Sequence, residues 1–391
     1  MPKFSRCKNG GKAIAAGGFG CVFSPPLSCD PQNSNKKYDK NSVSKLMFSN
    51  DADSEMLELE TVKPILVKIK NYKDYFITDN IFACKPSPLT YNDLLNFNSI
   101  CNNLIKSGVT LSNINSYIHL FKIINIPNGG YDLDTYWKNI FDANNWTGNK
   151  IQKDLIETHN SLIDLFKNGI VPMNRMGLYH FDIKSGNILK DDKNRTIKTR
   201  LIDWGLSGIV VDGEIPNIIR SRPFQFNLPL GVVLLSNSLD VDDIIKKYTT
   251  SSVSASISNG DLFNNVAAEI VKYHKDKKKG HIYDIYNIID TLKKFIKSED
   301  YSIYLNELDD HVVLHLKNIL AKYTDIETGT FDKKKYFLEV FSKNADIVGF
   351  ITTYLPIIEL YVRSTSSPTS SPSMYELIKI LIDYCYSTKY S

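Results

Sequence analysis

The sequence has few cysteines, and they form none of the usual metal-binding arrangements. There is no C-x-x-C pair, and no histidines lie at zinc-site spacing from a cysteine. We therefore expect reduced thiols and an intracellular protein rather than a disulfide framework. The six cysteines stand at positions 7, 21, 29, 84, 101 and 385.

Long apolar runs are also missing. The longest, such as LPLGVVLL at 228–235, are too short to span a bilayer. The first twelve residues contain no apolar signal segment, and Pro2 occupies the position where myristoylation needs glycine. We expect a soluble protein with no membrane partner.

A large excess of one charge is absent as well. The net charge is only +4 over 391 residues, so nothing in the bulk composition favours a nucleic-acid partner. Apolar residues make up 42% and charged residues 23%, as in an ordinary globular protein. This length is enough for two to three average domains.

Short apolar runs rich in β-forming residues fill about the first 125 positions, separated by Gly, Asn and Pro. The spacing of Leu59, Val62 and Leu66 predicts a helix over 51–66, with Asp51 or Asp53 as its N-cap. The expected strands include 12–23, 42–48, 72–78 and 116–126.

Helical patterns dominate from about residue 127 onward. The stretch 149–169 predicts a helix that ends at Gly169, and 261–322 reads as mostly helical, interrupted by a basic run at 274–281. The fold class is therefore α+β, with a small β-rich lobe, a hinge near 125–131 and a larger helical lobe.

The stretches GLYHFDIKSGNIL (177–189) and LIDWGLSG (201–208) carry the strongest chemical signal. Phosphoryl transfer from ATP needs a carboxylate to orient the acceptor hydroxyl, a cation for the phosphate and oxygen ligands for Mg²⁺. Asp182 supplies the carboxylate and Lys184 the cation, whereas Asn187 and Asp203 supply metal ligands. We expect Asp182 to touch little apart from the acceptor.

These residues resemble the catalytic loop HRDxKxxN and the metal motif DFG of the protein kinase superfamily. The resemblance implies a bilobal kinase fold that uses ATP and Mg²⁺ to phosphorylate Ser or Thr on protein substrates. It divides the chain into an N-lobe (1–126) and a C-lobe (127–391). In the C-lobe it implies a catalytic loop at 180–187, an activation segment at 203–229 and a helical insertion at about 231–340.

Further kinase motifs are sought upstream on the strength of that resemblance. Lys45 stands where the family's phosphate-binding lysine stands, with Glu55 or Glu58 as its carboxylate partner. In the hinge, Pro127 falls where an N–H normally bonds adenine, and proline has none. The nucleotide-binding positions implied are Ala15, Gly17, Gly18, Phe19, Gly20, Val22, Lys45, Glu55, Asn125, Ile126 and Leu189.

The C-lobe resemblance is looser. Pro229 matches the end of the family's activation segment, but Leu230 replaces its glutamate. Asp346 matches the helix aspartate that fixes the catalytic loop. The long insertion and the Asn/Lys/Ile/Tyr-rich composition resemble kinases of large nucleocytoplasmic DNA viruses such as mimivirus, which implies a host cytoplasm or virion location.

Phe181 replaces the arginine that, in many kinases, binds a phosphate on the activation loop. We therefore expect activity that does not depend on phosphorylation of Ser207 or Ser221. The alternative is that Arg220 or Arg222 binds such a phosphate instead.

Three other functions are weighed. A pseudokinase scaffold would usually have lost one of the motif residues. A small-molecule kinase of the aminoglycoside or choline type generally lacks the equivalents of Lys184 and Gly205. A zinc protease motif at 311–315 lacks its glutamate, so His311 and His315 are expected to be surface residues.

Overall fold

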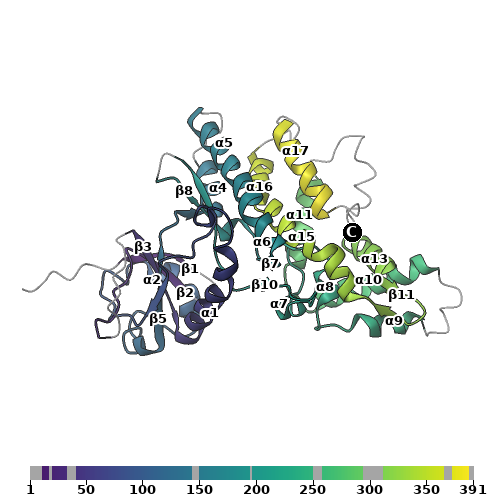
Figure 1. Cartoon of the computed structure of the whole chain (residues 1–391), viewed down its shortest axis with the longest axis horizontal. Helices are drawn as coiled ribbons and strands as arrows, with labels where there is room; N and C mark the ends of the chain where they lie inside the picture. The colour runs from purple at the N-terminus through teal and green to yellow at the C-terminus, as the bar shows by residue number, and fades with distance from the viewer. Residues whose placement is uncertain are drawn as a thin grey trace, which may run out of the picture. The chain divides into compact units, whose positions relative to one another are not determined.

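The computed structural model describes residues 11–16, 20–32, 41–142, 149–193, 196–249, 258–293, 311–364 and 372–386. It contains two compact units (Figure 1). The first comprises residues 1–130 and 190–205, and the second comprises 131–189 and 206–391. The chain passes from one unit to the other after Gly130, Leu189 and Gly205.

The first unit is built on a five-stranded antiparallel sheet in the order β1-β2-β3-β5-β4. Its short strands agree with the apolar runs that the sequence places in this half. The strands are β1 (Lys12–Ala16), β2 (Gly20–Ser24), β3 (Ser42–Phe48), β4 (Phe82–Cys84) and β5 (Phe121–Pro127).

The two faces of this sheet are covered by different segments, because side chains alternate along a strand. Helix α1 (Ser49–Leu66) covers one face, where its Ala52 packs with Met47 and Ile124. The other face holds the larger core, to which Leu46 and Phe97 belong. The helices of that second layer are α2 (Phe97–Ile100) and α3 (Asn102–Lys106).

Three local predictions in this unit are wrong. The expected strand at 116–126 begins only at Phe121, because Ile118–Leu120 form a 3₁₀ turn. Helix α1 begins at Ser49 with Phe48 in the N-cap position, so neither Asp51 nor Asp53 caps it. The expected strand at 72–78 is a short 3₁₀ turn, Tyr72–Asp74, followed by a single bridge from Phe76 to Leu201. The apolar pattern there reflects burial of Phe76, whose ring lies 5.7 Å from that of Trp204, rather than strand pairing.

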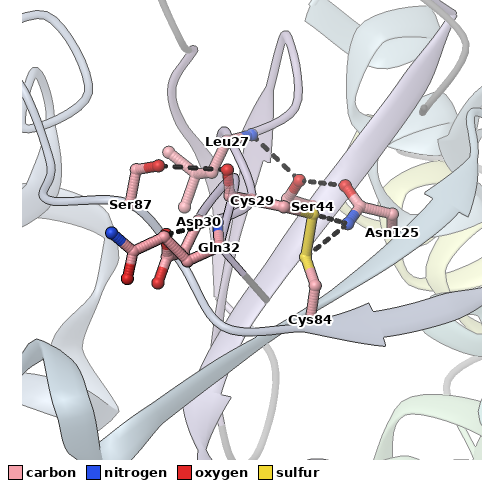
Figure 2. The surroundings of a disulfide bond; sticks show 8 residues. All are labelled: Leu27, Cys29, Asp30, Gln32, Ser44, Cys84, Ser87 and Asn125. Atoms are coloured by element: carbon pink, nitrogen blue, oxygen red, sulfur yellow. Dashed lines mark hydrogen bonds between the residues drawn. A yellow bond between two sulfur atoms is a disulfide. The ribbon is translucent and has the colours of Figure 1, made fainter. Parts of the chain in front are cut away.

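The expectation of reduced cysteines is contradicted by two disulfides, Cys21–Cys101 and Cys29–Cys84. The pairs are 80 and 55 residues apart, so their proximity exists only in the folded sheet. Figure 2 shows the second disulfide beside Asn125, whose amide nitrogen lies 3.5 Å from the Cys84 sulfur. Among the described residues, Cys385 is the free cysteine, and it is buried.

The second unit begins with β6 (Tyr131–Asp132), α4 (Leu133–Asp142) and α5 (Asn149–Asp164). The predicted helix end at Gly169 is wrong: α5 continues as a π-helix, Leu165–Ile170, and then as α6 (Val171–Arg175). Gly169 is buried inside this continuous helix. The chain turns instead at Gly177, whose φ of +78° suits glycine.

The catalytic-loop stretch lies between strands β7 (Leu178–Tyr179) and β8 (Ile188–Asp191). Strand β7 precedes it and pairs with β10 (Gly208–Ile209). Strands β8 and β9 (Lys198–Leu201) follow it and are neighbours in a sheet.

The described residues of 261–322 are mostly helical, as expected, and α10 (Asn259–Asp276) packs against α9 (Val241–Thr249) and α13 (His311–Tyr323) (Figure 1). His311 and His315 lie on α13, and both are buried, so the expectation of surface histidines is wrong. In the described part of 206–341, the helices are α7 (Asn217–Arg220), α8 (Val232–Leu235), α9 (Val241–Thr249), α10 (Asn259–Asp276), α11 (Ile282–Lys293), α13 (His311–Tyr323), α14 (Lys333–Tyr336) and a π-helix, Phe337–Phe341.

The last part of the second unit is also helical, with a π-helix, Ile382–Tyr386, at its end. No helix in the described ranges is both long and apolar enough to cross a membrane. The helices here are α15 (Ser342–Thr352), α16 (Leu355–Ser364) and α17 (Pro372–Leu381), and β11 (Thr324–Asp325) pairs with β12 (Thr330–Phe331) earlier in the unit.

Removing the Cys29–Cys84 crosslink should destabilise the first unit. A disulfide that closes a loop of this length contributes about 2–4 kcal/mol to the free energy of unfolding. We expect the Cys29→Ser/Cys84→Ser double variant to melt several degrees below the parent under non-reducing conditions. Peptide mapping of the parent protein without reductant should recover both crosslinked peptides. Recovery of free thiols at all four positions would contradict the pairing.

His274 should make the second unit sensitive to acid. Burial, followed by the charge of Lys279, lowers the pKa of His274 to about 4. The neutral ring therefore favours the fold above the unfolded pKa of about 6.5, and this stability is lost as pH falls from there towards 4. We expect His274→Phe to lose less stability between pH 7.5 and 5 than the parent, measured by thermal melting. Replacing the exposed His119 with Phe should leave that loss unchanged.

Candidate functional site

A row of side chains crosses the sheet of the first unit. Ala15 pairs with Val22, Val22 with Lys45, and Lys45 with Ile124 on four neighbouring strands. Directly opposed residues point to the same side of a sheet. Three residues that the sequence assigns to nucleotide binding (Ala15, Val22 and Lys45) therefore share one face, and Ile126 lies on that face two residues beyond Ile124.

Lys45 makes an ion pair with Glu55, with 2.5 Å between its Nζ and the carboxylate oxygen. Of the two candidates that the sequence leaves open, Glu55 is thus the one bonded to Lys45. Both side chains are largely shielded, with exposed fractions of 14% and 26%. This shielding makes the pair more than an ordinary surface salt bridge, because water screens it less.

Glu58, one turn further along α1, faces the metal-motif segment instead. A Cβ added to Gly205 would stand 3.3 Å from a Glu58 oxygen and 3.5 Å from an Asp203 oxygen. Burial raises the pKa of Glu58, and the charges of Glu55 and Asp203 raise it further. Asp203 itself has a φ of +70°, a conformation that non-glycine residues rarely adopt.

The remaining nucleotide-binding candidates are not all on the Lys45 face. The Asn125 side chain points to the opposite face, where it accepts a hydrogen bond from Ser44 at 2.7 Å (Figure 2). Gly20 lies so close to β3 that a Cβ there would stand 2.5 Å from the Leu46 carbonyl oxygen. Leu189 is half-buried in β8. Gly17, Gly18 and Phe19 lie outside the described residues.

In the second unit, Asp182 is buried and held by several donors. Lys184 donates to its Oδ2 at 2.8 Å, and Asn187 donates to the same oxygen at 3.0 Å. Asn227 donates to Oδ1 at 3.0 Å. Burial alone raises the pKa of this carboxyl, but Lys184 and Asn227 outweigh it, so the pKa lies below its usual value. Asp182 is therefore a charged acceptor at ordinary pH.

The loop that carries Asp182 is fixed from α15. The two oxygens of Asp346 accept the backbone N–H groups of His180 and Phe181, both at 2.9 Å. The predicted contact between Asp346 and this loop is thus confirmed. Phe181 has a φ of +56°, which is unusual for a bulky residue and needs such support. Its buried ring stacks on Tyr179.

The expectation that Asp182 touches little apart from its substrate is wrong. Besides the three donors above, the guanidinium of Arg222 lies 3.7 Å from Oδ1 and donates to the Phe181 carbonyl at 3.0 Å. Arg222 is buried in these contacts, which rules against its proposed alternative role as a phosphate ligand on the activation loop. Asn227 and this role of Arg222 were missed, because both lie 40 or more residues from Asp182 and belong to no recognised spacing.

The candidate metal ligands suit Mg²⁺ by their chemistry. Asn187 uses its amide nitrogen for both of its bonds to Asp182, at 2.8 Å to the carbonyl and 3.0 Å to the carboxylate, so its amide oxygen is not needed there. A cation would relieve the repulsion between Asp203 and Glu58. Among the described residues, no group of three or more His, Cys, Asp or Glu could hold a metal. Mg²⁺ usually relies on one or two carboxylates together with substrate phosphates.

No protein-family model matches the sequence, and no curated protein matches it either. Among solved structures, 135 chains match by structure, and they include the crystal structure of a kinase domain. It is 16% identical in sequence, with a TM-score of 0.34, and the match covers 94% of this chain and 92% of that one.

The Lys45–Glu55 pair provides a direct test of the first unit. If Lys45 binds nucleotide phosphates, Glu55→Gln should weaken Mg·ATP binding roughly tenfold, because the neutral amide no longer holds the ammonium in place. Isothermal titration of the full chain measures this. Glu60→Gln, on the exposed side of the same helix, should bind like the parent. Equal affinities for all three proteins would contradict a phosphate-binding role for Lys45.

Proposed function

We propose that this chain transfers the γ-phosphoryl group of ATP to Ser or Thr hydroxyls of protein substrates. The observation that carries the proposal is the convergence of Lys184 and Asn187 on the buried Asp182, in a loop held by Asp346. A charged carboxylate beside a cation and an amide is what phosphoryl transfer to a hydroxyl needs. The kinase motifs in the sequence support the same reading.

In the proposed reaction, Asp182 accepts a hydrogen bond from the acceptor hydroxyl and orients its oxygen towards the γ-phosphorus. The bond from that oxygen to phosphorus forms as the bond to the ADP oxygen breaks, and the hydroxyl proton passes to the Asp182 carboxylate. Lys184, 2.8 Å from Asp182, is placed to neutralise negative charge on the transferring group. The low pKa of Asp182 suits a residue that orients the hydroxyl rather than one that removes its proton early.

The first unit supplies the nucleotide-binding groups in this proposal. Lys45, oriented by Glu55, holds the α- and β-phosphates, and Ala15 and Val22 border the same face. Asn187 and Asp203 would hold Mg²⁺, which would supply charge neutralisation when it is bound with ATP. Pro127 offers no N–H to adenine, so we expect one hydrogen bond fewer there, worth roughly 1 kcal/mol.

The substrate class is inferred from two residues. Lys184 and Gly205 favour a protein hydroxyl over a small-molecule acceptor, because aminoglycoside and choline kinases generally lack their equivalents. The small net charge gives no reason to propose a nucleic-acid or membrane partner. The viral resemblance remains part of the proposal. The two disulfides favour an oxidising setting such as a virion over a reducing cytoplasm.

Asp182→Asn tests the catalytic assignment. The change removes the charged acceptor, so we expect phosphotransfer to fall about a hundredfold or more. Thermal stability should fall as well, because the new amide would oppose the donors from Asn227 and Lys184. Both are measured on the full chain with labelled ATP, Mg²⁺ and a basic serine peptide.

Asp212→Asn is the matched control. Asp212 is exposed, lies outside the catalytic loop and has a φ of +50°, which asparagine also tolerates. This variant should transfer phosphate at the parent rate. A fully active Asp182→Asn protein would rule out the proposed mechanism.

A further inference from the structure

The segment Arg222–Leu228 lies outside the catalytic loop in sequence but makes hydrogen bonds to it. Arg222 donates to the carbonyl oxygen of Phe181, and the N–H of Phe181 donates to Asp346. Both backbone polar groups of this strained residue are therefore hydrogen-bonded. Asn227 donates both to Asp182 and to the Ile183 carbonyl, at 3.0 and 3.1 Å. The position of Asp182 therefore depends on where this segment lies.

The segment is itself held by the turn between α10 and α11 of the insertion. The N–H of His281 donates to the Phe224 carbonyl at 2.8 Å, and the His281 ring stacks on Phe226 with 5.2 Å between centroids. His274, near the end of α10, packs edge-on against Phe224 at 5.0 Å. These contacts place ring and backbone groups of the insertion directly on the residues between Arg222 and Asn227.

Gly280 shows how closely this turn approaches the Arg222–Leu228 segment. Its φ is +66°, and a Cβ there would stand 2.3 Å from the Phe224 carbonyl oxygen and 2.8 Å from the Pro223 Cβ. Any side chain at this position would have to push the backbone of the Arg222–Leu228 segment away. The two backbones are thus so close that only glycine fits at position 280 without displacing the segment.

We propose that the turn 277–281 is a positioning element for catalysis: through Phe224 and Phe226 it fixes Arg222 and Asn227, which in turn fix Asp182. The inference rests on the proposed function. In many kinases a phosphate on the activation loop, bound by an arginine beside the catalytic aspartate, orders the equivalent segment. Here Phe181 occupies that arginine's place, and the insertion supplies the ordering through packing and hydrogen bonds instead.

The test compares two glycine substitutions in the full chain. Gly280→Ala and Gly329→Ala both place alanine at positive φ, with similar angles of +66° and +64°. Only the first collides with the segment; at Gly329 the nearest atom is the flexible Lys246 side chain, at 3.1 Å. Labelled ATP, Mg²⁺ and a basic serine peptide report kcat and the KM for ATP.

We expect Gly280→Ala to lower kcat roughly tenfold or more while the KM for ATP stays within about twofold, because Asp182 is misplaced but the nucleotide-binding residues are untouched. Gly329→Ala should match the parent. Arg222→Met should show the same loss, and Arg222→Lys should recover part of it. A kcat for Gly280→Ala equal to that of Gly329→Ala, or no recovery by lysine, would overturn the inference.

Hydrogen exchange separates failure of the inference from failure of the proposed function. If the parent transfers no phosphate, the function is wrong, yet Gly280→Ala should still speed exchange in residues 178–189 relative to Gly329→Ala; unchanged exchange would overturn the inference as well. If Gly280→Ala does not fold, His281→Leu replaces it in both measurements. That variant keeps the N–H but loses the ring stacked on Phe226, and His119→Leu is its control.

Discussion

The second unit depends on keeping a charged carboxylate inside protein. Asp182 is buried, and an isolated buried carboxylate costs several kcal/mol unless donors surround it. Lys184 and Asn187 supply donors from its own loop, and Asn227 supplies one from the Arg222–Leu228 segment. The neighbouring peptide is fixed by Asp346 and Arg222. Any change that separates these elements leaves either the Asp182 carboxylate or its hydrogen-bond donors without a partner. The positions of the elements around the loop are therefore constrained.

In the first unit, the two faces of the sheet carry different kinds of residues. One face carries the Lys45–Glu55 pair beneath α1, and the other carries the apolar core with both disulfides. Alternation along β3 sends Lys45 to one face and Ser44 to the other, where Ser44 bonds Asn125. A polar, partly exposed face and a crosslinked core can therefore coexist on strands of only three to seven residues.

Sequence reasoning succeeded where the relevant residues are close in the chain. The helix after β3 follows from local spacing. The pairing of Lys45 with a glutamate of that helix and the grouping of Asp182, Lys184 and Asn187 follow from the resemblance to kinase motifs. Contacts between distant segments were missed: Asn227 and Arg222 at Asp182, and the cysteine pairs 55 and 80 residues apart. Gly169 was misleading for another reason, since it lies buried within a continuous helix and does not end one. The roles of the site residues in catalysis stay predictions.

Transfer of phosphate by the purified full chain, under oxidising conditions that keep the disulfides, tests the central claim most directly. The protein would be mixed with γ-labelled ATP, Mg²⁺ and a basic protein rich in serine and threonine, with the acceptor residue identified by peptide mapping. We predict label on serine or threonine, formed at a rate proportional to the amount of enzyme. Tight binding of Mg·ATP with no label transferred to any acceptor would contradict the claim and identify the chain as a nucleotide-binding scaffold.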